Sequence, residues 1–208
     1  EIGSGLVGSE MCIRDRSIGS HSFEQIGSGV GIDLILGSDT NIGSYAFAQA
    51  RIKSIKLGDN TKVGDYAFNE ISTLARVIMP DDATVTIGAY AFANCYSLEA
   101  IDLSKLVGTV GDYAFSGCGK IVFANLENVE HIGAYAFANC YGITKISIPN
   151  VKTIADHAFT KLTDGAMAPQ FTEIELPSTL TSIGAYAFAY ANKLSLIHIS
   201  EPTRPEPI

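Results

Sequence analysis

Residues 132–140 read Ile-Gly-Ala-Tyr-Ala-Phe-Ala-Asn-Cys, and they are followed by the spaced apolar residues Ile143, Ile146 and Ile148 and by Pro149. The first six form a hexad, Ile-Gly-x-Tyr-Ala-Phe, which recurs along the chain with small variations. Its eight copies begin at Ile18, Ile42, Val63, Ile87, Val110, Ile132, Ile154 and Ile183. Eight of the ten phenylalanines occupy the last hexad position, so the chain is an array of internal repeats.

A second element precedes the hexads. It has apolar residues at its first, fourth and sixth positions, as in Ile52, Ile55 and Leu57, and a proline often follows it. The alternation at its end is typical of a β-strand. Because proline has no N–H to donate to a strand ladder, we expect Pro149 and Pro177 to lie where strands end.

The two elements together predict a solenoid. A unit of about 22 residues has too little core to fold alone, so each must bury its apolar face against its neighbours. We expect the Ile and Phe of the hexad to form ladders inside the coil and the Gly to supply a sharp corner. The segment Tyr-Ala-Phe-x-x-Cys is expected to form one helical turn, with Phe and Cys on one face.

These repeats resemble the BspA-like branch of the leucine-rich-repeat family, whose pattern runs roughly Leu-x-x-Ile-x-Leu-Pro and then Ile-Gly-x-x-Ala-Phe-x-x-Cys-x-x-Leu. The resemblance covers about residues 17–193. It implies an α/β solenoid, a right-handed coil with a parallel β-sheet on its concave face and short helical turns opposite. It also implies a surface or secreted protein of bacteria or some protists that acts in adhesion.

The ends of the chain differ from the repeats. Residues 6–16 and 194–204 follow no repeat pattern, and the reverse complement of a DNA that can encode the first segment encodes most of the second in another frame. A transposase-type sequencing adapter would have this property, whereas ordinary terminal linkers are the alternative. We therefore expect non-native tails at 1–16 and 194–208. The solenoid of about eight repeats then covers 17–193, and because the chain does not begin with Met, we expect a fragment.

The composition argues against two classes of protein. The formal net charge is −8 at pH 7, whereas nucleic-acid binding normally needs a basic stripe and a polybasic membrane anchor needs clustered cations. No apolar run approaches the roughly 20 residues that span a bilayer. The hydrophobic share of 47% favours a folded chain over a disordered one.

Three cysteines share one repeat position, Phe-x-x-Cys: Cys95, Cys118 and Cys140. Thiols can form disulfides or bind metals, but here their spacing is the repeat period and not a metal-ligand pattern. We expect a ladder of buried thiols that pack as small apolar side chains.

Histidine and acidic residues do not form a recognisable catalytic motif. His21 and His157 replace the hexad Tyr, and His131 precedes a hexad, so they lie one or more coils apart. Asp156 and His157 are adjacent in sequence, which does not supply the geometry of a catalytic triad. We expect no catalytic residue, no metal site and no cofactor.

The candidate binding surface is the outward side of the main strands, where alternate residues should face solvent on the concave sheet. Its candidate partner-binding residues are Lys56, Arg76, Ile78, Asp102, Phe123, Asn125, Lys145, Glu173 and Glu175. They are basic in the early coils and acidic in the last complete one, with Ile78 and Phe123 as candidate apolar anchors. The Tyr residues of the hexads are expected to stack along the convex side, where a ligand could also recognise them.

These features predict a non-catalytic protein-binding scaffold, a fragment of an adhesin-like protein at the cell surface or outside the cell. The expected partner is a host or neighbouring-cell surface protein, with a glycan as a second class; nucleic acid and membrane insertion are not expected. Two alternatives stay open, a targeting array of an enzyme whose catalytic domain is missing and an intracellular interaction scaffold. Because both caps are missing, we also expect self-association through apolar ends.

Overall fold

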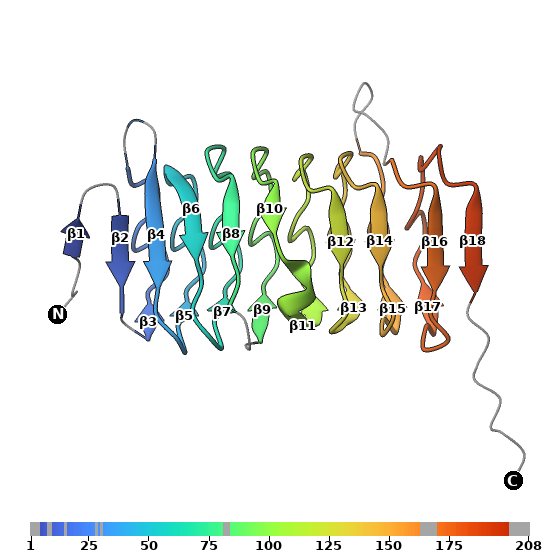
Figure 1. Ribbon diagram of the computed structural model, residues 1–208, viewed down its shortest axis with the longest axis horizontal. Helices are drawn as coiled ribbons and strands as arrows, with labels where there is room; N and C mark the ends of the chain where they lie inside the picture. Colours follow the sequence, from blue (N-terminus) through green and yellow to red (C-terminus); the bar gives the residue numbers. More distant parts are fainter. Residues whose placement is uncertain are drawn as a thin grey trace, which may run out of the picture.

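The computed structural model describes residues 5–7, 10–14, 16–27, 29, 31–80, 84–162 and 170–199. In these residues the chain forms one elongated solenoid, with β1 and β18 at opposite ends (Figure 1). Each complete coil gives one strand to a main sheet and one short strand to a second sheet. The predicted repeat solenoid is confirmed.

The main sheet is formed by the element that precedes each hexad. Its strands are β1 (Gly5–Val7), β2 (Glu10–Ile13), β4 (Ile32–Leu36), β6 (Ile52–Lys56), β8 (Arg76–Ile78), β10 (Ala100–Ile101), β12 (Phe123–Asn125), β14 (Lys145–Ser147), β16 (Glu173–Leu176) and β18 (Leu196–Ile199). They pair in parallel, except that β1 is antiparallel to β2. Ladder hydrogen bonds join the strands from β1 to β10, β12 to β14, and β16 to β18. The described main sheet therefore has two breaks, one at the 3-10 turn η1 (Leu103–Lys105) and one between β14 and β16.

The second sheet lies beside the main sheet and has eight strands in the described residues, all parallel. They are β3 (Ser17–Ile18), β5 (Asn41–Ile42), β7 (Lys62–Val63), β9 (Val85–Ile87), β11 (Leu106–Val110), β13 (Val129–Ile132), β15 (Thr153–Ile154) and β17 (Ser182–Ile183). Each ends at the first residue of a hexad, so the hexad begins where the chain leaves this sheet (Figure 1).

The rest of each hexad forms a ribbon of turns, here called the turn ribbon. In the second coil, the N–H of Tyr45 donates to the C=O of Asp65 in the next coil (3.0 Å), while the N–H of Ala46 donates to the C=O of Gly43 in its own coil (3.2 Å). The same alternation continues with Phe47, whose N–H donates to the next coil at 2.8 Å. The coils are thus joined by backbone hydrogen bonds outside the two sheets as well.

The prediction of short helical turns opposite the main sheet is wrong. The fourth hexad residue has a left-handed backbone, with φ of 56° to 59°, at His21, Tyr45, Tyr66, Tyr90, Tyr113, Tyr135, His157 and Tyr186. A residue in this region interrupts a right-handed helix, so the chain forms successive turns instead. Within the described residues, η1 is the only helical segment.

The predicted interior ladder of phenylalanines is confirmed. All eight hexad rings stack face to face, with centroid separations from 5.1 Å for Phe23 on Phe47 to 5.6 Å for Phe92 on Phe115. The six inner rings are fully buried, whereas Phe23 and Phe188 at the two ends are partly buried. The core is therefore a continuous stack along the solenoid.

The hexad glycine serves close contact between coils. A Cβ on Gly111 would lie 2.5 Å from the carbonyl carbon of Gly88 and 2.6 Å from the amide nitrogen of Ala89 in the preceding coil. This space is filled by backbone, which cannot move away as the end of a side chain could. The glycine thus sets how closely successive coils approach.

Parts of both predicted tails lie in the main sheet. In β2, Met11 is opposite Leu34 of β4, and in β18, Ile197 is opposite Ile174 of β16. Ile13 of β2 is buried. These segments therefore extend the sheet at each end, and their adapter origin stays a prediction.

Candidate binding surface

The nine candidate residues share one face of the molecule. Eight lie on β6, β8, β12, β14 and β16, and Asp102 directly follows β10. All are exposed except Asn125, which is half-buried. They alternate with buried residues such as Val77 and Ile174. The prediction that they face outward is therefore confirmed.

The early part of this face is mainly basic. Strand register places Arg76 of β8 beside Ser54 of β6, and Ile78 beside Lys56. The hydroxyl of Ser54 donates to the carboxylate of Asp33 (2.5 Å). Ile78 is thus an exposed apolar side chain beside cations, in a shallow hollow of about 400 Å³.

The middle of the face contains an aromatic contact. Phe123 of β12 is opposite Lys145 of β14, and the Lys145 ammonium lies 5.6 Å from the centre of the Phe123 ring. A cation at this distance from a ring is attracted to its face. Asp102 has a structural task nearby, because its carboxylate accepts hydrogen bonds from the N–H (3.0 Å) and hydroxyl (2.6 Å) of Ser104 at the start of η1.

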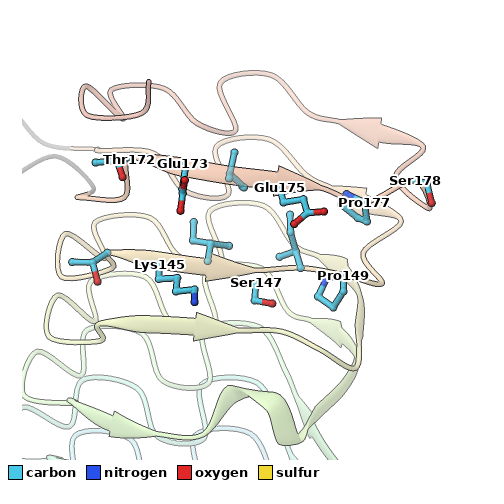
Figure 2. Close-up of a pocket in the computed structure, with 12 residues that line it drawn as sticks. Lys145, Ser147, Pro149, Thr172, Glu173, Glu175, Pro177 and Ser178 are labelled. Atoms are coloured by element: carbon cyan, nitrogen blue, oxygen red, sulfur yellow. The ribbon is translucent and has the colours of Figure 1, made fainter. Parts of the chain in front are cut away.

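A groove of about 630 Å³, larger than the hollow beside Ile78, lies on this face between β14 and β16 and is here called the β14–β16 groove (Figure 2). It lies at the second break of the main sheet. Its lining residues are Thr144, Lys145, Ile146, Ser147, Ile148, Pro149, Thr172, Glu173, Ile174, Glu175, Pro177 and Ser178. Three of them, Lys145, Glu173 and Glu175, are candidate residues predicted from the sequence, whereas the groove itself was not predicted.

Hydrogen bonds at both ends hold the groove in place. Before the strands, the N–H of Gln170 donates to the C=O of Ile143 (3.1 Å). Beyond them, the hydroxyl of Thr179 donates to the C=O of Val151 (3.0 Å). Between these points no ladder joins β14 to β16 in the described chain, so the groove runs along two strand edges.

The ring stack predicted for the hexad tyrosines is confirmed, and it also includes two histidines. Eight rings from His21 to Tyr186 stack with centroid separations of 4.5 to 5.0 Å. Partial burial in the stack raises the pKa of Tyr66 and Tyr90, and the neighbouring phenol adds to the rise. These rings support the turn ribbon of adjoining coils.

The buried thiol ladder is also confirmed. Cys95, Cys118 and Cys140 are free and fully buried, and each Sγ donates to the carbonyl of the hexad phenylalanine one coil earlier, at 3.1 to 3.2 Å. Burial raises the pKa of Cys95 and of Cys140 to about 12. A neutral, inaccessible thiol is a poor nucleophile and a poor metal ligand.

The histidines and acidic residues are not brought together. His131 contacts the Thr153 hydroxyl through Nδ1 (2.8 Å), whereas His157 lies in the ring stack. The carboxylate of Asp156 accepts the N–H of Ala185 in the next coil (2.7 Å), a structural role that sequence reasoning missed. Among the residues that the structure describes, no group of three or more His, Cys, Asp or Glu could hold a metal ion.

The described residues contain no helix with the length and apolar character needed to cross a membrane.

Comparisons with known structures agree with this architecture. A leucine-rich-repeat protein of T. pallidum is 24% identical, with a TM-score of 0.63 over 93% of this chain and 88% of its own. A leucine-rich cell surface protein of Faecalibacterium prausnitzii is 21% identical (TM-score 0.64), and a leucine-rich-repeat protein of Bacteroides ovatus is 24% identical (0.61). Those two matches cover 97% and 95% of this chain but only 56% and 51% of the other proteins. No curated protein matches the chain.

The family match covers most of the repeats. The sequence model of the BspA type leucine-rich-repeat region matches six copies, over residues 40–164 and 166–204. The match includes the seven hexads from Ile42 onward and the main-sheet strands from β6 to β18. The chain therefore belongs to the BspA-type leucine-rich-repeat family.

Proposed function

We propose that this chain is a non-catalytic scaffold that binds a protein partner across the outer face of its main sheet. The observation that carries the proposal is the set of eight exposed candidate side chains held on successive coils of one rigid face. Leucine-rich repeats generally mediate protein binding. Charged residues around exposed apolar ones, here Ile78 and Phe123, are typical of a protein interface.

The geometry favours binding over catalysis. Asp156 and Asp102 are engaged by backbone N–H groups, and Cys95 and Cys140 are neutral and buried. Leucine-rich repeats are generally non-enzymatic scaffolds. Turnover of a substrate in a hydrolase panel that is abolished by His157→Ala would overturn this part of the proposal.

We place the protein at the cell surface or outside the cell, as an adhesin-like molecule. The support is family membership together with the similarity to a leucine-rich cell surface protein. The proposed partner is correspondingly a surface protein of a host or neighbouring cell.

An array of extracellular-matrix proteins and glycans tests the scaffold proposal. We expect the chain to bind protein spots and the double variant Lys56→Glu/Arg76→Glu to lose that binding while its circular dichroism is unchanged. Lys62→Glu is the matched control, because Lys62 is exposed on β7 of the second sheet. Binding only to glycans, or equal binding by both variants, would contradict the proposal.

The C-terminal coil carries a second proposal, self-association. Ile183, Tyr186 and Tyr190 are 45%, 68% and 64% exposed there, whereas the equivalent Ile132 in the middle of the solenoid is buried. Several exposed apolar side chains on one coil favour contact with another copy. We expect light scattering to show association that Ile183→Ser/Tyr186→Ser reduces and that Tyr96→Ser, an exposed tyrosine elsewhere, leaves intact. A monomer at high concentration would refute it.

We further propose that residues 1–16 and 194–208 are translated adapter sequence. The support is the single DNA duplex that can encode residues 6–16 on one strand and most of residues 194–204 on the other. Source codons that depart from that duplex would refute the proposal, and codons that match it would support it.

A further inference from the structure

We propose that the β14–β16 groove binds an extended peptide segment that carries lysine or arginine side chains. The inference rests on the proposed function and assigns a ligand class to one part of the same face.

The shape of the groove fits an extended chain. Its walls are two neighbouring parallel strands, and its volume of about 630 Å³ lies in the range of binding sites for small ligands and short segments. The side chains of Ile146, Ile148 and Ile174 are buried beneath it and make a rigid apolar floor. Hydrogen bonds at Gln170 and Thr179 close both ends, so the groove does not depend on a rearrangement to form.

Hydroxyl groups along the groove make a peptide the favoured ligand. Because β14 and β16 lie side by side and their coils are hydrogen-bonded at both ends, an extended peptide would lie over the two strands and contact their outward side chains. The hydroxyls of Thr144, Ser147 and Thr172 add side-chain donors and acceptors along the same line. The lining contains no aromatic ring on which a sugar could stack, which disfavours a glycan in this groove.

The charge of the groove selects basic peptides. Figure 2 shows the carboxylates of Glu173 and Glu175 on the side of β16 that faces β14, whereas the Lys145 side chain extends away from β16. The Lys145 ammonium lies over the Phe123 ring on β12, which draws it toward the far side of β14. These three are the charged residues that line the groove, so its local charge is negative.

Fluorescence polarisation tests the inference on the full chain. The probes are dye-labelled hexapeptides with Lys or Arg at each position in turn, and the same peptides with Glu in that place. We expect basic probes to bind and acidic ones not to bind. The double variant Glu173→Gln/Glu175→Gln should weaken binding about fivefold to tenfold, because two exposed charge pairs are lost. Salt at 0.5 M should weaken the wild-type interaction in the same way.

The matched control is Glu99→Gln, which removes an exposed carboxylate from the same face outside the groove and should leave probe binding unchanged. Equal binding of acidic and basic probes, or full binding by the folded Glu173→Gln/Glu175→Gln variant, would overturn the inference. If the probes fail while array binding is still lost in Lys56→Glu/Arg76→Glu, the groove assignment is refuted and the scaffold proposal stands. If both fail, both are refuted.

Discussion

Replacing Phe115 with alanine should destabilise the solenoid more than any comparable change at its ends. The Phe115 side chain is fully buried and lies between Phe92, at 5.6 Å, and Phe137, at 5.4 Å. Removing a buried phenylalanine side chain costs about 3–5 kcal/mol in free energy of unfolding. That cost includes the loss of two ring stacks, each worth about 0.5–1.5 kcal/mol. We therefore expect a value in the upper half of the range, about 4 kcal/mol or more.

Phe188→Ala is the matched comparison. Phe188 stacks on one hexad ring only, Phe159 at 5.4 Å, and it is partly buried. In a repeat protein each coil contributes to stability through its interfaces with its neighbours. A substitution in an end coil therefore weakens one such interface, whereas a substitution in a central coil weakens two. We therefore expect Phe188→Ala to cost about 2 kcal/mol, half the central value.

Urea unfolding followed by circular dichroism and tyrosine fluorescence measures both changes, since the chain has no tryptophan. With a slope of about 2 kcal/mol per molar urea, the midpoint should fall by about 2 M for Phe115→Ala and about 1 M for Phe188→Ala. A loss below about 1 kcal/mol for Phe115→Ala, or an equal loss for Phe188→Ala, would refute the stacked core as the main source of stability.

Three further outcomes are expected. Gly111→Ala should cost about 1–3 kcal/mol in urea unfolding, because its Cβ would lie 2.5 Å from backbone, and an unchanged midpoint would contradict that contact. In native protein, iodoacetamide should label Cys12 but not Cys95 or Cys140, which should react only in urea; mass spectrometry after digestion distinguishes these cases. The free energy of unfolding should fall from about pH 9 toward pH 12, because the buried thiols keep their protons while unfolded thiols ionise near 9.0. The raised pKa of Tyr66 acts in the same direction above pH 10. Unfolding curves that coincide at pH 8 and pH 11 would contradict the last prediction.

The solenoid could be predicted because the same type of residue recurs at each structurally important position of the repeat. Phenylalanine at a fixed position, with spaced aliphatic residues before it, specifies an apolar interior whatever the local backbone does. The same regularity correctly placed Cys95, Cys118 and Cys140 inside, since a residue at one repeat position lies in one environment.

The turn ribbon could not be predicted because its deciding feature has no sequence signal. A left-handed backbone is usually marked by glycine, but here tyrosine and histidine adopt it in every hexad. Hydrogen bonds between coils hold them there, as the N–H of Tyr45 shows, and such bonds exist only once the coils are stacked. Contacts between coils therefore produce left-handed turns in place of the helical turn expected from local spacing.

The outward-facing side chains of the candidate surface could be predicted, but the hollows on that surface could not. Alternation along each strand placed Lys56, Arg76 and Phe123 outside. The β14–β16 groove depends on a missing ladder beside the longest coil. The sequence shows that length, 29 residues between the hexads at Ile154 and Ile183 against 21 to 24 elsewhere, but not how the neighbouring strands pair.

The turn ribbon also gives the rod a polarity. The N–H groups of the fourth and sixth hexad residues point to the following coil, as from His21 to Ser44 and from Phe159 to Ala187, whereas the N–H of the second points to the preceding coil. In the described chain, the last ribbon therefore ends in donors such as the N–H of Phe188, and the first begins with acceptors such as the C=O of Ser22. At the fourth and sixth positions, head-to-tail contact of two rods would set donors of one ribbon against acceptors of the other, and such joining has no internal stop.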